Sequence, residues 1–257
     1  MKYPKLSFIL LLLVIISCKQ KPATTVGAEK MAKPNKSTKR ELLSTTKNNT
    51  DKIYEDLVTF LCINTPGDFP IVFVEKDKKI LSFFVGDKFP YEADKIPFKR
   101  GDLIRIRWKK DTIIPPDGED SYQSEVLLNA EKIKDGKLTV YKQKHPEKIE
   151  IDNQIKEDIS KEDLQQIDDV ALYFLATSTD NDFLSSIEEA EKADESVGNL
   201  MIAISDEFIK NEPYMKIDYN YLYRGQISTL KTIYTDKDCA KIFLLDEKTG
   251  SLLRYWQ

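Results

Sequence analysis

The sequence predicts an α+β fold, in which a small β-barrel is followed by an α+β half with about three helices and a C-terminal antiparallel sheet. Three observations predict this fold. Residues 53–141 hold short apolar runs separated by turns, residues 160–193 have apolar side chains at helical spacing, and residues 215–256 return to strand-like alternation. The expected boundaries are 51–145 for the barrel and 146–257 for the α+β half.

The barrel prediction rests on the strands of the first half. After Gly101-Asp102, the apolar residues Ile104 and Ile106 alternate with charged ones, which predicts a strand with one largely charged face. Other strands are expected at 71–74, 80–85, 124–133 and 138–141. Five or six strands in about ninety residues favour a closed barrel, because closure removes exposed strand edges. The pattern resembles the OB-fold, and an SH3-like barrel would look similar.

The second half is expected to begin with helices. Ser160-Lys161-Glu162-Asp163 resembles a capping box, with a capping serine and an acid three residues later. One helix should follow this box and a second should cover 182–193. Residues 197–210 fit either a third helix or a buried strand, because 200–204 is continuously apolar. Strands at 215–223 and 242–256 would then form the C-terminal sheet.

The N-terminus has the three parts of a secretory signal peptide. Lys2 and Lys5 precede an apolar stretch at 6–16, which as a helix would be about 16 Å long and would cross only half of a hydrocarbon core. The stretch ends in Ile15-Ile16-Ser17-Cys18, which resembles the lipobox of bacterial lipoproteins. The resemblance implies that residues 1–17 are removed and that Cys18 carries lipid on its sulfur, which anchors the chain to a membrane.

Residues 18–50 are predicted to be a flexible, lipidated tether, because they hold prolines and small polar residues but few large apolar ones. Lys19 follows the cysteine where inner-membrane retention signals have aspartate. Lys19-Gln20-Lys21 also lacks the acidic residues of surface-exported lipoproteins from Bacteroidota-like bacteria. We therefore expect a lipid-anchored protein of the outer membrane that faces the periplasm.

Charge separates the tether from the body that follows it. The whole chain carries −4, the tether +6 and the signal peptide +2, so residues 51–257 carry −12. Nucleic-acid binding needs a basic surface that releases counterions from phosphates. The acidic body therefore argues against a nucleic-acid partner.

The sequence holds few of the motifs that carry catalysis. His145 is the only histidine, and no zinc-protease, serine-hydrolase or phosphate-loop motif occurs. We therefore expect no catalytic residues, no metal and no cofactor. Cys62 and Cys239 could pair in an oxidising periplasm, but both lie in apolar segments, and we interpret them as free buried thiols.

Three features are candidates for binding or modification. Arg105 and Arg107 could contact an anionic ligand, or could pair with acids such as Glu125 and Glu131 across the sheet. Asp111-Thr112-Ile113 resembles the sequon that Bacteroidota-like bacteria O-glycosylate, with Thr112 as the acceptor.

The third feature is the tyrosine series Tyr219, Tyr221 and Tyr223. These side chains could form an aromatic platform for a glycan or a peptide. Because they continue an apolar face, they could instead be core residues with hydroxyls at the rim.

Together these observations predict a non-enzymatic binding or structural module of the envelope, with an unidentified protein or glycan as partner. Two alternatives stay open. One is an immunity protein that neutralises a periplasmic toxin through its acidic surface. The other is a hydrolase of envelope glycans that uses two carboxylates.

Overall fold

The computed structural model describes residues 52–64, 69–87, 89–92, 95–113, 121–145, 150–153, 160–192 and 198–256. These residues all belong to one compact unit, Lys47–Gln257. The predicted signal peptide, Cys18 and the tether up to residue 50 lie outside the described residues, so cleavage and lipidation stay predictions. None of the helices in the described part of the chain is long and apolar enough to cross a membrane.

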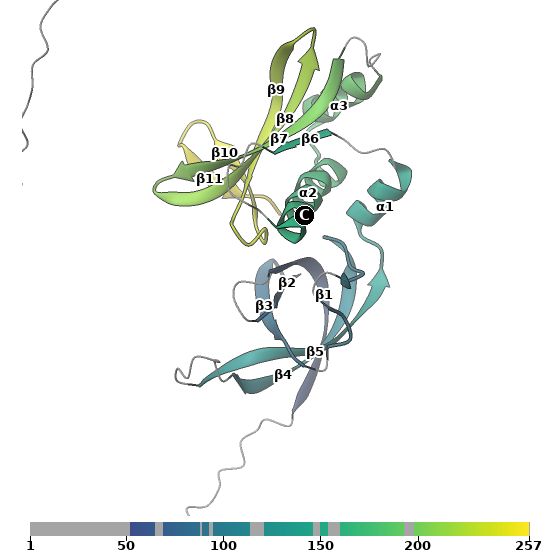
Figure 1. The fold of residues 1–257 in the computed structure, drawn as a ribbon, viewed down its shortest axis with the longest axis vertical. Helices are drawn as coiled ribbons and strands as arrows, with labels where there is room; N and C mark the ends of the chain where they lie inside the picture. Colours follow the sequence, from purple (N-terminus) through teal and green to yellow (C-terminus); the bar gives the residue numbers. More distant parts are fainter. Residues whose placement is uncertain are drawn as a thin grey trace, which may run out of the picture. The chain divides into compact units, whose positions relative to one another are not determined.

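The first half is a closed five-stranded barrel, as predicted (Figure 1). Its strands are β1 (Ile53–Asn64), β2 (Ile71–Lys76), β3 (Lys79–Val85), β4 (Leu103–Ile113) and β5 (Tyr122–Lys134). The strand order is β1-β2-β3-β5-β4, and β3 pairs with β5 in parallel whereas the other pairs are antiparallel. This Greek-key order is that of an OB-fold.

The alternation in β4 places its apolar residues inside the barrel. Ile104 and Ile106 are fully buried, whereas Arg105 and Arg107 face outward. The segment that joins β3 to β4 contributes Phe98 to the same core, in edge-to-face contact with Phe60 of β1 at 5.7 Å between ring centroids. This segment therefore belongs to the barrel core.

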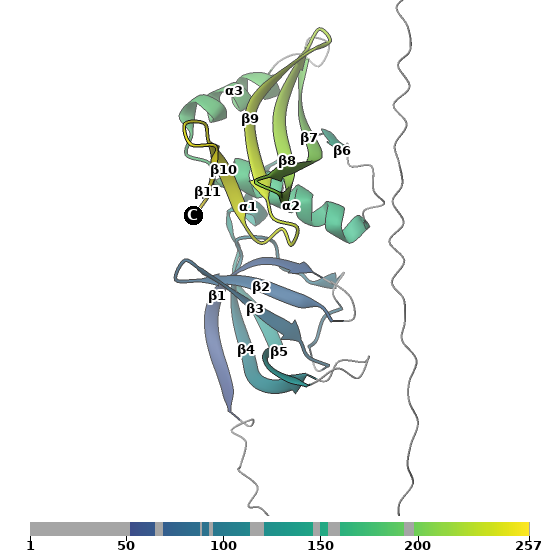
Figure 2. The same ribbon diagram turned by 90° about the vertical axis from the view of Figure 1, so that its left-hand side faces the viewer.

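The second half is a six-stranded sheet covered by two helices (Figure 2). Its elements are α1 (Lys137–Lys144), β6 (Glu150–Asn153), α2 (Lys161–Thr177), α3 (Asn181–Lys192), β7 (Gly198–Ile209), β8 (Glu212–Tyr223), β9 (Gln226–Thr235), β10 (Ile242–Asp246) and β11 (Ser251–Arg254). The order is β11-β10-β9-β8-β7-β6, antiparallel except for the β6–β7 edge pair. The α+β class, the number of helices and the C-terminal antiparallel sheet are confirmed, although α1 lies where no helix was expected.

Helix α2 begins at the predicted capping box. The Ser160 hydroxyl accepts a hydrogen bond from the backbone N–H of Asp163 at 3.0 Å. One face of the helix, including Val170 and Phe174, packs into the main core of the second half. The opposite face is polar and is free to line a site.

Two expectations for single segments need correction. Residues 138–141 were expected to be a strand but belong to α1, in which only Leu138 is buried. Four apolar-rich residues are too short for their spacing to distinguish a strand from one turn of a helix. For 197–210 the strand alternative is right, because Ile202 and Ile204 are fully buried under the helices as part of β7.

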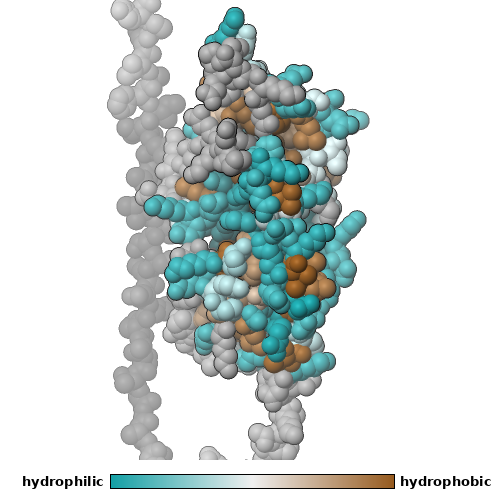
Figure 3. Space-filling view, turned by 90° about the vertical axis from the view of Figure 1, so that its right-hand side faces the viewer, coloured by the Kyte–Doolittle hydropathy of each residue, from teal (hydrophilic) through white to brown (hydrophobic). Residues whose placement is uncertain are grey.

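Exposed apolar residues are scattered on the face that Figure 3 shows. Hydrophobic side chains there form separate groups between hydrophilic ones. Scattered apolar residues are normal on a protein surface. The hydropathy of this face therefore does not indicate a docking surface.

Candidate functional site

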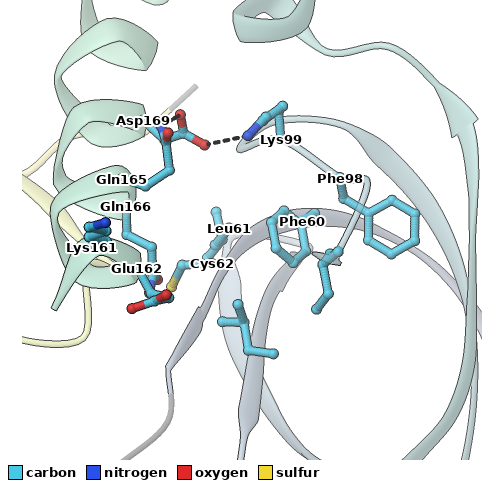
Figure 4. A pocket seen from close by; sticks show the side chains of 12 residues that line it. Phe60, Leu61, Cys62, Phe98, Lys99, Lys161, Glu162, Gln165, Gln166 and Asp169 are labelled. Atoms are coloured by element: carbon cyan, nitrogen blue, oxygen red, sulfur yellow. Dashed lines mark hydrogen bonds and ion pairs between the residues drawn. The ribbon is translucent and has the colours of Figure 1, made fainter. Parts of the chain in front are cut away.

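A cleft of about 300 Å³ lies between the barrel and α2 (Figure 4). Its barrel side consists of residues 60–63, Ile96, Phe98 and Lys99. Its helix side consists of Lys161, Glu162, Gln165, Gln166 and Asp169. The volume is at the lower end of the range for small-molecule pockets.

The two sides of the cleft differ in chemistry. The barrel side is apolar, with Leu61 and Cys62 next to α2 and the rings of Phe60 and Phe98 packed in the barrel core, and the polar face of α2 stands opposite (Figure 4). The Oε1 atom of Gln166 is buried and has no hydrogen-bond partner among the described residues. A buried acceptor without a partner costs about 1–3 kcal/mol, so a ligand donor that reaches this atom would recover that cost.

One end of the cleft is closed by an ion-pair network around Asp169. Its carboxylate pairs with Lys99 of the barrel segment at 3.6 Å, the contact drawn in Figure 4, and also with Lys142 of α1. These two cations neutralise Asp169 within the protein. The charges left for a ligand are those of Lys161 and Glu162, which are exposed at the start of α2.

The spacing between the cleft walls is held by Arg100. This side chain is only 4% exposed, and its guanidinium donates to the carbonyl oxygens of Cys239 at 2.5 Å and Ala240 at 3.0 Å. It also lies over the ring of Tyr173 on α2, at 5.3 Å from the centroid. Arg100 therefore connects the barrel to both the sheet and the helix.

A second connection centres on the fully buried carboxylate of Asp102. It accepts hydrogen bonds from the backbone N–H of Lys99 at 2.8 Å and of Gly136 at 2.7 Å, and from the Thr139 hydroxyl at 2.7 Å. Lys132 forms an ion pair with it at 2.8 Å. Burial alone would raise the pKa of Asp102, but these four donors hold it below its ordinary value.

The backbone around Asp102 is too crowded for side chains at two positions. A Cβ atom on Gly136 would lie 2.2 Å from the carbonyl oxygen of Gly101. Gly101 itself has φ +89° and lies against the ring of Tyr173. The chain therefore passes from the barrel to α1 through a tight backbone crossing beside the cleft.

The structure places the two predicted arginines on the outer face of β4, away from the cleft lining. Arg105 pairs with Glu55 at 3.2 Å and with Glu131 at 3.4 Å, which is the cross-strand pairing considered for the sequence. Arg107 is exposed and has no ion-pair partner within the described ranges. A role of either arginine in binding stays a prediction, and Arg107 is the one available for it.

The three tyrosines of β8 differ in burial and do not form one platform. Tyr219 is fully buried, and its hydroxyl donates to the carbonyl oxygen of Ala171 at 2.7 Å, so it belongs to the core. Burial raises the pKa of Tyr219 well above its ordinary value. Tyr221 is half-buried and stacks with the more exposed Tyr223 at 6.2 Å between centroids. Only these last two side chains are accessible to a ligand.

The remaining candidate residues lie apart from the cleft, except for one cysteine. Thr112 is exposed in β4, where its hydroxyl accepts from Gln123 at 2.5 Å, and its glycosylation stays a prediction. His145 stacks on Tyr141 at the end of α1. Cys62 and Cys239 are free and buried, and Cys62 lines the cleft. The described residues hold no cluster of three potential metal ligands.

Sequence reasoning missed most of the cleft residues. Phe60 and Phe98 look like ordinary core residues, and Gln166 looks like a solvated helix position. Lys99 and Arg100 precede the charged strand and look like part of its solvated basic face, although Arg100 is buried. A signal existed only for Gly101-Asp102 and Gly136, because glycines next to a strand indicate close backbone approach.

No protein-family model and no curated protein matches the chain. Among solved structures, the chain is similar to an aspartyl-tRNA synthetase from Entamoeba histolytica, with 8% sequence identity and a TM-score of 0.21. The similarity covers 69% of this chain and 48% of that one, so the chain spans about half the length of that protein. At this TM-score the similarity supports no argument about fold or function.

Proposed function

We propose that the protein is a non-enzymatic binding module of the bacterial envelope that holds a small ligand in the cleft between the barrel and α2. Lipid on Cys18 anchors it to the outer membrane, where it faces the periplasm. The signal peptide and lipobox support the location. The body contributes a preformed cleft with one apolar and one polar wall.

The observation that carries the proposal is the buried, unpartnered Oε1 atom of Gln166 opposite the apolar barrel side of the cleft. Ligand pockets are mostly apolar and use a few placed polar groups for orientation. A ligand that fits therefore has an apolar body that packs on the barrel side of the cleft, and a hydroxyl or amide N–H that donates to Gln166.

The volume of about 300 Å³ limits the ligand to a small molecule or to one end of a longer one. Aromatic alcohols, aromatic amides and the hydrophobic ends of envelope metabolites have this chemistry. A duplex or an extended nucleic-acid strand does not, and the acidic body disfavours both.

A fluorescence titration with anilinonaphthalene sulfonate tests the proposal, because this dye combines aromatic rings with one N–H donor. We expect saturable one-to-one binding with a blue-shifted emission. Gln165→Trp should abolish it, because an indole on this exposed cleft residue fills the space between α2 and the barrel.

Ser185→Trp is the matched control, because it adds the same side chain at an exposed position of α3 outside the cleft lining. It should leave the titration unchanged. If Gln165→Trp is folded by circular dichroism and still binds the dye like the wild type, the cleft is not the binding site.

A further inference from the structure

The two cysteines of the body come together where the barrel meets the α+β half. Cys62 lies near the end of β1, and Cys239 lies in the loop between β9 and β10. Each is 4% exposed. The Sγ atom of Cys62 donates to the carbonyl oxygen of Asp238, the residue before Cys239, at 3.1 Å.

Local structure fixes both partners in this position. The register between β1 and β2 shifts between Phe60 and Cys62, and Leu61 and Cys62 are both buried in a small cluster with Ala240. A second contact joins the same elements, because the Asn64 amide donates to the Asp238 carboxylate at 2.6 Å.

The loop that carries Cys239 is also held from within. The Asp236 carboxylate accepts from the backbone N–H of Ala240 at 2.8 Å and of Lys241 at 2.9 Å. Cys239 adopts φ +55°, a backbone conformation that non-glycine residues seldom take, and its carbonyl oxygen points to Arg100. The position of Cys239 is therefore determined by several contacts rather than by one.

These contacts put the sulfurs within reach of each other. A trans peptide places the carbonyl oxygen of Asp238 about 2.8 Å from Cα of Cys239. The Sγ atom of Cys62 is thus within about 6 Å of that Cα atom. A disulfide needs Cα atoms about 4.4–6.8 Å apart, so bond formation requires rotation of the Cys239 side chain and a shift of its loop toward β1.

Both thiols are free in the structure, which describes the reduced protein. Contrary to the interpretation of the sequence, we infer that Cys62 and Cys239 form an intramolecular disulfide when the protein folds in an oxidising compartment. The inference concerns the same body as the proposed function and rests on its export. Each thiol loses one proton and one electron, and the S–S bond forms as an external disulfide is reduced to two thiols by thiol–disulfide exchange. In the envelope, the oxidant is a dithiol oxidoreductase in its disulfide form.

The burial of both residues determines when the bond can form. Burial raises the pKa of the Cys239 thiol to about 12 and that of the Cys62 thiol well above its ordinary value. The reactive species is the thiolate, so the folded protein reacts slowly with an oxidant. Oxidation therefore occurs during folding, before the β9–β10 loop closes over β1. The bond then ties the barrel to the sheet at the edge of the cleft.

Refolding in a glutathione redox buffer tests the inference without depending on export. The mature chain with Cys18→Ser is unfolded, refolded with oxidised and reduced glutathione, unfolded again without reductant and treated with iodoacetamide. We expect a mass lower by two hydrogen atoms, no alkylation, and a protease fragment in which the two cysteines are linked. The oxidised protein should also unfold at a higher guanidinium concentration than the reduced protein.

Cys62→Ala and Cys239→Ala serve as controls, and each should leave one thiol that alkylates or carries a single glutathione. If the wild-type body alkylates at both cysteines after this refolding, the inference is wrong. A failure of export appears instead as loss of membrane attachment in cells, so the two proposals fail in different experiments.

Discussion

Arg100 donates to the carbonyl oxygen of Cys239 at 2.5 Å, and this contact joins the start of β4 to the β9–β10 loop inside the protein. Burying a guanidinium is costly unless its donors are paired, and here both terminal nitrogens are paired whereas Nε has no partner among the described residues. Its contacts with two carbonyl oxygens and with the ring of Tyr173 therefore link three elements that are far apart in the sequence. This link is one of the contacts that hold the barrel against α2 beside the cleft.

Replacing Arg100 should destabilise the folded protein. We expect Arg100→Ala to lower the free energy of unfolding by about 3 kcal/mol, because two hydrogen bonds from a charged donor are lost and two carbonyl oxygens remain buried. Urea unfolding measures the change. Arg107→Ala is the control, because this exposed arginine should change stability by less than about 0.5 kcal/mol. Equal stabilities of the two variants would contradict the role of Arg100.

The buried carboxylate of Asp102 should make stability depend on pH. Its folded pKa lies below the ordinary value of 3.8, so its contribution is fully present above that pH and is lost as pH falls through the folded pKa. We expect Asp102→Asn to cost about 3 kcal/mol near neutral pH, and the difference from the wild type to shrink near pH 3.

Urea unfolding at both pH values measures this difference. Asp135→Asn is the matched control, since Asp135 pairs with the same Lys132 at 3.1 Å but is 44% exposed. It should change stability by about 0–1 kcal/mol. A cost of Asp102→Asn that is the same near pH 7 and near pH 3 would rule out the linkage.

The two arginines of β4 should respond differently to the same change. Arg105→Gln loses its pairs with Glu55 and Glu131, and we expect stability to fall by about 0–1 kcal/mol. Arg107→Gln should leave the melting temperature unchanged. If this face binds an anion, Arg107→Gln is the variant that weakens binding to dextran sulfate. Identical melting temperatures and affinities for both variants would remove the face from consideration.

The sequence patterns predicted this fold well where burial has a clear period. Ile104 and Ile106 alternate with charged residues, and both are in the barrel core. The strand prediction for 138–141 was wrong, because four residues are too few to show whether the apolar spacing is that of a strand or of a helix. The cleft residues could not be predicted from the sequence, because Phe60 and Gln166 come together only when the barrel packs against α2. Arg100 resembled its basic neighbours although it is buried, since nothing in the sequence around it indicates the carbonyl oxygens of the β9–β10 loop.

The expected lipid anchor can be tested separately by replacing Cys18. Cys18→Ala should leave uncleaved precursor and remove acyl label, because the thiol that carries the lipid is missing. Fractionation of cells with labelled palmitate measures both effects, and Cys62→Ala is a control that should keep the label. A Cys18→Ala protein that is processed normally and stays with the outer membrane would show that the lipobox interpretation is wrong.

The most direct test of the cleft uses two probes that differ by one hydrogen-bond donor, para-propylphenol and para-propylanisole. Backbone amide NMR spectra of the body, titrated with each, give both the affinity and the location of binding. We predict shifts in segments 60–63 and 162–169 and about fivefold tighter binding of the phenol, because only its hydroxyl can donate to Oε1 of Gln166. Gln166→Leu should abolish this preference. Equal binding of the two probes to the wild type, or shifts confined to other segments, would contradict the proposal that this cleft is the binding site.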